Sequence, residues 1–370
     1  MKRTTSKQFS LLVTALLCLS TLSACDRKTP PLTEQEQRIM TPLITQLQTH
    51  CFGRFLIDLP AGVDVGTQQT TGHNRKVIIR VTDTNISLKA FHEQMKELEA
   101  TYRAKKHREG WDYLYDVQTP TADIKVFEVL ENATNLPQDA RAIEGYKWSN
   151  DTIIQMRTKA TDVSDPKYQN DPIAKQWRTD TGEKKALITK LLNQANGRKD
   201  NEIPTSPGLC FKNGFLAMAA TDEEEFDATV DFKNFPDVSL RFKSDAGLGA
   251  DDTLLQRKDL HKFVDFRHGN VLRKGIVQLS GITQAEEWLV EAETEYDSKP
   301  KVRGHYFTLE GNSKSPEYNV PFFSLTLETA GLYERNNELK EPTKSSLSDA
   351  EALALWDAIT RTIRMRPGAF

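Results

Sequence analysis

The residue with the clearest chemistry in this sequence is Cys25, which ends the tetrapeptide Leu-Ser-Ala-Cys at 22–25. Three basic residues and a short apolar segment, 11–22, precede it, in the order found in a secretory signal peptide. A Cys directly after the small residues at the cleavage point is typical of bacterial chains that are lipid-modified on that thiol. Acyl chains contribute about 0.8 kcal/mol per buried CH₂, so several of them anchor a protein stably. We predict a signal peptide at 1–24 and lipid attachment at Cys25; an ordinary signal peptide that happens to contain a Cys is the alternative.

The residues after Cys25 indicate where the protein is held. Asp26 resembles the signal that keeps lipoproteins on the inner membrane of enteric-type bacteria, a rule that varies between bacterial groups. We therefore expect a periplasmic protein anchored to a membrane, with the inner membrane favoured. Residues 25–44 are predicted to be a tether containing Pro30 and Pro31, followed by a short helix.

Two further cysteines, Cys51 and Cys210, belong to the folded part of the chain. In an oxidising periplasm two thiols usually form one disulfide, which is the pairing we predict. Two buried free thiols are the alternative. A catalytic Cys is a further alternative, but no His-paired context argues for it.

Other residues that could do chemistry do not complete a known pattern. His92-Glu93 resembles half of a zinc-protease motif, but Lys96 stands where the second His would be. Residues 311–315 lack the second glycine of a hydrolase nucleophile elbow. The acidic runs 222–225 and 251–252 are more typical of solvated turns than of calcium sites. We therefore predict no catalytic residue, no metal and no cofactor, and favour a protein that acts by binding.

Composition fits an ordinary globular body, with 27% charged and 38% hydrophobic residues. Three of the 49 Lys and Arg residues precede Cys25 and none of the 52 Asp and Glu residues do, so the mature chain carries a net charge of about −6. A net negative charge makes nucleic acid an unfavourable partner.

Hydrophobic periodicity divides the chain into two similar halves. The clearest helix follows Ser87, with apolar residues at steps of three and four from Leu88 to Tyr102, and Ser348 to Glu351 form a capping box before a last helix. Strands are expected at 51–60, 76–81, 113–117, 124–130, 142–148 and 152–159, and again at 209–218, 226–232, 238–242, 273–279, 288–295, 305–311 and 322–329; further helices are expected at 34–48, before Gly197 and at 253–264.

Each half thus shows two strands, a helix, several more strands and a closing helix, with a Pro-containing linker at 200–208 between them. This order predicts an α+β protein of two similar domains, 45–199 and 200–370, each an antiparallel sheet with helices packed on one face. A single undivided α+β fold is the alternative.

Three stretches resemble a known family. They are Cys-Phe-Gly-Arg-Phe-Leu-Ile-Asp-Leu-Pro at 51–60, Gly-Leu-Cys-Phe at 208–211, and the ending Trp-Asp-Ala-Ile-x-x-Thr-Ile-Arg-x-Arg-Pro-Gly-Ala-Phe at 356–370. The chain resembles the immunity lipoproteins paired with type VI secretion lipase effectors of the fourth class. The resemblance implies a periplasmic inhibitor, with no enzymatic activity or cofactor, that binds a delivered phospholipase. An envelope lipoprotein with a scaffold or small-ligand function is the alternative, and an enzyme with an unrecognised site is a third.

Two loops are the candidates for contacting that partner, because a cleft is expected between two linked domains. Residues 161–181 carry Tyr168, Ile173 and Trp177 in a polar stretch, and 311–320 carry Tyr318. Small local cores are the alternative use of these side chains. The partner-binding interpretation has the domains closing like a claw on the lid elements of the lipase, as the family is thought to act.

Overall fold

The computed structural model describes residues 30–71, 77–168, 170–172, 174–296, 299–314, 317–335 and 338–370. The expected signal peptide, Cys25 and Asp26 lie outside the described residues. No helix in the described part of the chain is both long and apolar enough to cross a membrane.

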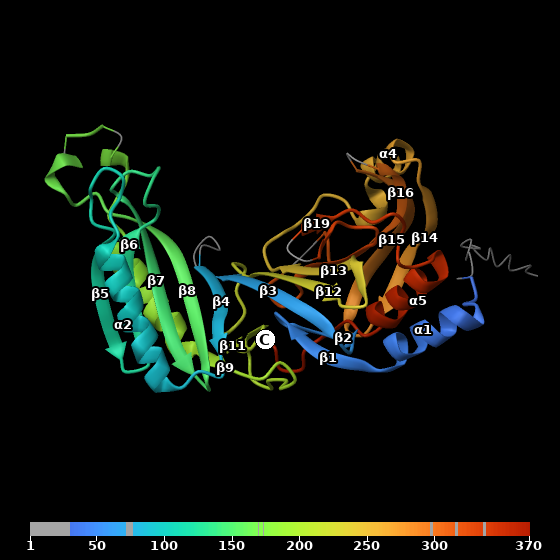
Figure 1. Ribbon diagram of the computed structural model, residues 1–370, viewed down its shortest axis with the longest axis horizontal. Coiled ribbons are helices and arrows are strands. Elements are labelled where there is room, and N and C mark those ends of the chain that lie inside the picture. Colours follow the sequence, from blue (N-terminus) through green and yellow to red (C-terminus); the bar gives the residue numbers. More distant parts are fainter. Residues whose placement is uncertain are drawn as a thin grey trace, which may run out of the picture.

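One antiparallel sheet runs through both halves of the chain and gives the molecule two lobes (Figure 1). The halves join where β3, from the first half, pairs along its length with β12, from the second. In spatial order the 12 strands are β14 (Asn270–Leu279), β15 (Ile282–Tyr296), β16 (Lys299–Gly311), β17 (Phe322–Glu328), β13 (Phe235–Asp245), β12 (Glu225–Phe232), β3 (Val63–Thr71), β4 (Val77–Thr84), β8 (Thr152–Thr161), β7 (Ala140–Ser149), β6 (Ile124–Leu130) and β5 (Leu114–Thr121).

The predicted α+β class and antiparallel sheets are confirmed, but the helices do not share one face of the sheet. Alternate residues of a strand point to opposite faces. On β6, Phe127 and Val129 pack with Phe91 of α2 (Leu88–Ala104), whereas Val126 packs in the core that contains Ile188 of α3 (Thr181–Gln194). In the second half, α4 (Asp259–Phe266) and α5 (Asp349–Thr360) likewise cover opposite faces of β15. Both faces of each lobe therefore carry a helix.

The largest core lies on the face that α3 and α5 cover, and residues from both halves build it. Its centre is an aromatic cluster in which the Phe55 ring lies 5.3 Å from both Phe242 and Phe323. Phe55 begins the second strand of a hairpin, β1 (Leu47–Phe52) and β2 (Phe55–Pro60), that lies beneath the sheet of the second half. Helix α1 (Glu34–Thr45) packs beside α5 in this lobe, whereas the C-terminus lies near β9 and β11 in the middle of the molecule (Figure 1).

The expected single strand at 51–60 is therefore a hairpin with the two-residue turn Gly53-Arg54. Gly53 has a φ of +57°, which glycine adopts without steric cost. β3 was not predicted, because most of its residues are polar. The helix expected at 253–264 is instead a short 3₁₀ turn, η4 (Leu254–Gln256), followed by α4.

A second small sheet joins the halves, formed by β9 (Ala195–Gly197), β11 (Gly214–Leu216) and β10 (Leu209–Phe211). Next to it, the structure contains the predicted Cys51–Cys210 disulfide, and Gly53 and Cys210 exchange two backbone hydrogen bonds of 2.9 and 2.8 Å. The guanidinium of Arg198 donates to five backbone carbonyls, two of which, those of Asp200 and Glu202, belong to the linker. The linker is therefore held in place by hydrogen bonds.

The remaining elements are the hairpin β18 (Tyr333–Arg335) and β19 (Glu338–Lys340), β20 (Arg364–Met365), and the turns η2 (Pro166–Tyr168) and η3 (Ala174–Gln176).

Candidate functional site

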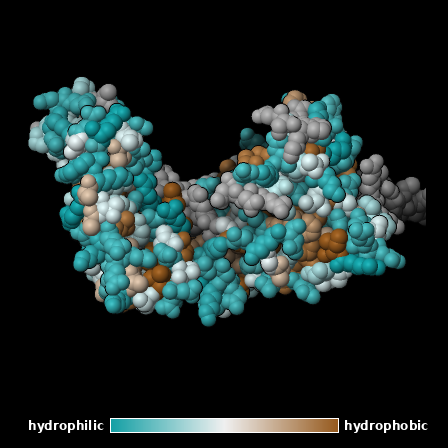
Figure 2. All heavy atoms as spheres, viewed as in Figure 1, coloured by the Kyte–Doolittle hydropathy of each residue, from teal (hydrophilic) through white to brown (hydrophobic). Residues whose placement is uncertain are grey.

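The surface is hollowed between the two lobes (Figure 2). Its floor is the exposed face of β4, β3, β12, β13 and β17, which we call the central face. Directly paired residues of an antiparallel sheet point to the same side. Arg241 pairs with Thr326, Thr326 with Thr308, and Thr308 with Trp288, which packs against η4 and α4.

The same reasoning places α2 on this face at the opposite end. Arg241 pairs with Thr229, whose strand pairs with β3, and β3 pairs with β4 at Ile78. Ile78 pairs with Arg157, and Arg157 with Glu144, whose carboxylate accepts a 2.7 Å hydrogen bond from Tyr102 of α2. Helices α2 and α4 thus stand at the two ends of one sheet face and leave the strands between them open.

The central face is polar and ion-paired. It includes a depression of about 520 Å³ that is lined by Thr229, Ser239, Arg241, Lys243, Ser324, Thr326 and Glu328. Asp227 pairs with Arg241 and, at 3.7 Å, with Lys243, and its carboxylate raises the pKa of Arg241. These strands therefore have two different faces. The apolar side chains fill the core, and the polar ones form an exposed floor.

The two loops expected to contact a partner leave the same end of the sheet, on either side of this floor. The register places the last residues of β8, the first of β17 and the last of β16 at that end. Five strand spacings separate β8 from β17, which corresponds to roughly 24 Å. A helix with its side chains is about 10–12 Å across, so this gap is wide enough for a partner element.

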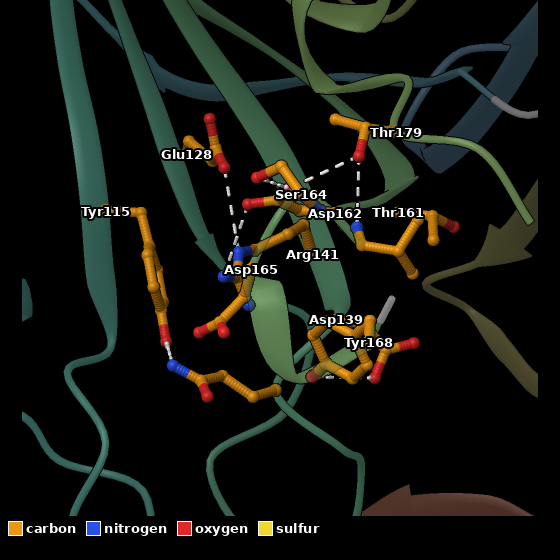
Figure 3. A network of polar contacts seen from close by, with 12 residues as sticks. Tyr115, Glu128, Asp139, Arg141, Thr161, Asp162, Ser164, Asp165, Tyr168 and Thr179 are labelled. Atoms are coloured by element: carbon orange, nitrogen blue, oxygen red, sulfur yellow. Dashed lines mark hydrogen bonds and ion pairs between the residues drawn. The ribbon is translucent and has the colours of Figure 1, made fainter. Parts of the chain in front are cut away.

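The loop after β8 is fixed at its base (Figure 3). Asp180 and Thr161 close it with two hydrogen bonds, at 2.7 Å from the Thr161 N–H to the Asp180 carboxylate and at 3.0 Å between their backbones. Below them, the buried Arg141 guanidinium lies 3.6 Å from the carboxylate of Asp162 and stacks over the Tyr115 ring. The Tyr168 hydroxyl donates to Asp139 at 3.3 Å. Tyr168 is half-buried, and its hydrogen bond attaches the loop to the residue that precedes β7.

The predicted contact residues therefore differ in their surroundings. Trp177 is 50% exposed and lines a groove beside the end of β8, and Tyr318 is 52% exposed in the turn between Glu317 and Val320. Ile173 lies outside the described residues. The structure leaves Trp177 and Tyr318 accessible on loops on either side of the floor. Arg141, which anchors one of these loops, carried no sequence signal because its partners are distant in the chain.

One hydrogen-bonded chain connects groups in the order of a catalytic triad. His305 lies 3.0 Å from Asp349 and 2.9 Å from the Thr329 hydroxyl. However, His305 and Thr329 are 2% and 1% exposed, so no substrate reaches this hydroxyl. The contact instead joins α5 to β16. Among the described residues, no group of three or more His, Cys, Asp or Glu side chains is placed to hold a metal ion.

Family comparison assigns both halves to one family. The model of the Tle cognate immunity protein 4 N-terminal domain matches residues 48–198, and that of the C-terminal domain matches residues 202–368. The chain belongs to the Tle cognate immunity protein 4 family. The resemblance noted in the sequence is thereby confirmed.

Solved structures share the fold over most of the chain. The Tle4–Tli4 complex contains a chain 25% identical to this immunity protein, with a TM-score of 0.65 over 87% of this chain and 98% of that one. The immunity protein TplEi of the type VI secretion system of Pseudomonas aeruginosa matches in its apo form with 24% identity, a TM-score of 0.63 and the same coverage. TplEi complexed with an "L" peptide matches with 23% identity and a TM-score of 0.61, over 87% of this chain and 99% of that one. No curated protein matches by sequence.

Proposed function

We propose that this protein is a periplasmic, membrane-anchored immunity protein that binds a cognate type VI secretion phospholipase and occludes its lid and substrate access. The observation that carries this proposal is the match of both halves to the two domains of one immunity family. The open central face, with a loop on each side of it, supplies a surface for such a partner. The protein acts by binding and not by catalysis.

The relatives support an effector as the partner. One similar chain was solved as the Tle4–Tli4 complex, and TplEi was solved with an "L" peptide. For this chain we propose the same kind of partner, bound between the lobes. The alternative, a small-ligand protein, is less favoured because the described grooves are open and lined by many charged side chains.

The hollow is preformed, because the junction between the lobes is covalently and electrostatically fixed. The sheet continues through it, and the disulfide and the buried Arg54–Glu224 ion pair link the first half of the chain to the second. We therefore propose that the lobes hold the effector as fixed jaws, in place of the hinged closure that two domains on a flexible linker would allow. A preformed site avoids the ordering cost that closure would add to binding.

The direct test of this function is binding to the proposed cognate type VI secretion phospholipase. Isothermal titration of the purified mature chain into that lipase is expected to give a saturable complex. An absence of binding at micromolar concentrations of both proteins would exclude the proposed function.

Replacement of both exposed aromatic residues, Trp177→Ala with Tyr318→Ala, is expected to weaken effector binding by at least thirtyfold. Exposed aromatic anchors of an interface contribute about 2 kcal/mol or more each, whereas surface truncations leave stability within about 0.5 kcal/mol. Ile276→Ala is the control, because Ile276 is 72% exposed on β14, the strand at the far edge of the sheet. Equal affinities of the double variant and the control would show that the two loops do not contact the effector.

The anchoring part of the proposal predicts the behaviour of Cys25→Ala. Without the thiol no lipid can be attached, so the variant is expected to leave the membrane fraction and remain folded in the soluble periplasmic extract. The Tyr168→Phe variant should stay with the membranes, since Tyr168 lies far along the chain from the lipid. Soluble fractionation of the wild type would contradict lipid anchoring. A density gradient that separates the inner from the outer membrane shows which of the two carries the protein, and Asp26 favours the inner membrane.

A further inference from the structure

The groove beside Trp177 has a composition that specifies what binds in it. This groove, which we call the β8 groove, has a volume of about 640 Å³ and lies between the end of β8, the start of α3 and the loop between them. Its lining residues are Ile78, Glu131, Pro137, Asp139, Ala140, Arg157, Thr158, Lys159, Ala160, Thr161, Trp177, Asp180 and Lys184. Strand β8 pairs with β4, a strand of the central face, and Ile78 of β4 lines the groove, so the groove lies beside that face.

One wall of the β8 groove is apolar and exposed. Ile78 and Trp177 are 41% and 50% exposed, and Pro137 is exposed near them. The Trp177 backbone N–H donates to the Ala174 carbonyl at 3.0 Å, and the Asp180 to Thr161 contacts close the loop just beyond it. The indole is therefore presented by an ordered segment, and covering it with an apolar side chain would remove exposed apolar surface from water.

Each charged side chain that lines the groove has an ion-pair or hydrogen-bond partner among the described residues, except Lys184. Arg157 contacts Glu144 at 3.0 Å, and Lys159 contacts Glu131 at 2.5 Å. Asp139 accepts from Tyr168, and Asp180 accepts from the Thr161 N–H. In the part of the chain that the structure describes, the half-buried Lys184 ammonium makes no side-chain hydrogen bond or ion pair. The groove is therefore lined by both an exposed indole and one ammonium, that of Lys184, that has no ion-pair partner among the described residues.

We propose that the β8 groove binds a segment of the effector that places a bulky apolar side chain against Trp177 and a carboxylate on Lys184. The proposal rests on the function proposed above and adds a second chemical requirement to it. Charge complementarity selects the carboxylate, because an acidic group is the one that Lys184 can pair with without displacing an existing ion pair. The apolar side chain follows from the wall formed by Trp177, Ile78 and Pro137.

The test compares charge variants of two lysines on α3, Lys184 and Lys190, by titration against the proposed cognate phospholipase. Lys184→Met is expected to weaken binding about fivefold and Lys184→Glu about thirtyfold to a hundredfold, because the second places like charges together. Lys190→Glu, which makes the same charge change at an exposed site outside the β8 groove, should bind as the wild type does. A glutamate near the first turn of a helix is favourable, so thermal unfolding of Lys184→Glu should match the wild type.

A charge-reversal scan of the lipase then identifies the carboxylate. One Asp→Lys or Glu→Lys substitution in the lipase is expected to restore binding to Lys184→Glu and to leave binding to Lys190→Glu unimproved. If the wild-type chain binds the lipase and both glutamate variants bind equally well, the groove proposal is wrong and the proposed function stands. If the wild-type chain does not bind, both fail.

Discussion

Glu224→Ala is expected to lower the free energy of unfolding by about 3–5 kcal/mol, the cost of leaving a buried charge without its partner. The side chains of Arg54 and Glu224 are 2% and 6% exposed, and two hydrogen bonds of 2.8 Å join them. Arg54 also donates to the Ala369 carbonyl near the end of the chain. Because Arg54 lies in the β1–β2 turn and Glu224 precedes β12, the loss falls on a contact between the two halves of the chain.

Asp227→Ala is the matched control for this change. It breaks the Arg241 ion pair on the central face, whose arginine and aspartate side chains are 52% and 23% exposed. Exposed pairs contribute about 0–1 kcal/mol, so this variant should stay close to the wild type. Urea unfolding followed by tryptophan fluorescence measures both variants. Similar losses for the two would show that the buried pair does not hold the two halves of the chain together.

Loss of the disulfide, through Cys51→Ser with Cys210→Ser, is expected to cost about 2–5 kcal/mol. The bridge joins residues 159 positions apart, and the chain-entropy model gives about 5 kcal/mol for a loop of that size. Reductant should lower the stability of the wild type and leave that of the double variant unchanged. Thiol labelling of unfolded, non-reduced protein provides the independent check: two reactive thiols per mature chain would show that the bridge does not form.

These junction contacts change how the role of each domain can be tested. Cutting the chain between residues 199 and 200 would separate Arg54 from Glu224 and Cys51 from Cys210. It would also remove Phe55 from the cluster that contains Phe242 and Phe323. Isolated halves are therefore expected to be poorly folded as well as inactive. Point substitutions such as Trp177→Ala test the two loops without this confusion.

Local sequence signals predicted the elements that depend on local contacts. Ser87 caps α2, accepting a 3.2 Å hydrogen bond from the Ala90 N–H, and Ser348 with Glu351 forms the expected capping box before α5. The expected strand at 124–130 has the same bounds as β6. In each case the signal, a helix cap or an apolar periodicity, lies within a few consecutive residues, so it can be recognised without knowing the tertiary contacts.

Features that depend on distant contacts were missed for physical reasons. β3 has few apolar residues, so its sequence did not indicate a strand. Its place in the middle of the sheet is fixed by backbone pairing with β4 and with β12, which is distant in the sequence. The run 51–60 is apolar on both sides of Gly53, so its pattern did not show the turn. Nothing local indicated that this hairpin packs under the other half, or that Lys184 lies next to Trp177 in one groove. The family resemblance supplied the partner class that residue patterns alone did not.

The central claim is that this chain neutralises a phospholipase by covering its access to lipid. The most direct measurement is the activity of the proposed cognate phospholipase on phospholipid vesicles during titration with the mature chain that lacks its lipid. The account predicts that activity falls to the uncatalysed background as the chain saturates the lipase, and that Trp177→Ala with Tyr318→Ala shifts the curve at least thirtyfold to higher concentration. Full lipase activity in the presence of saturating, bound chain would contradict it.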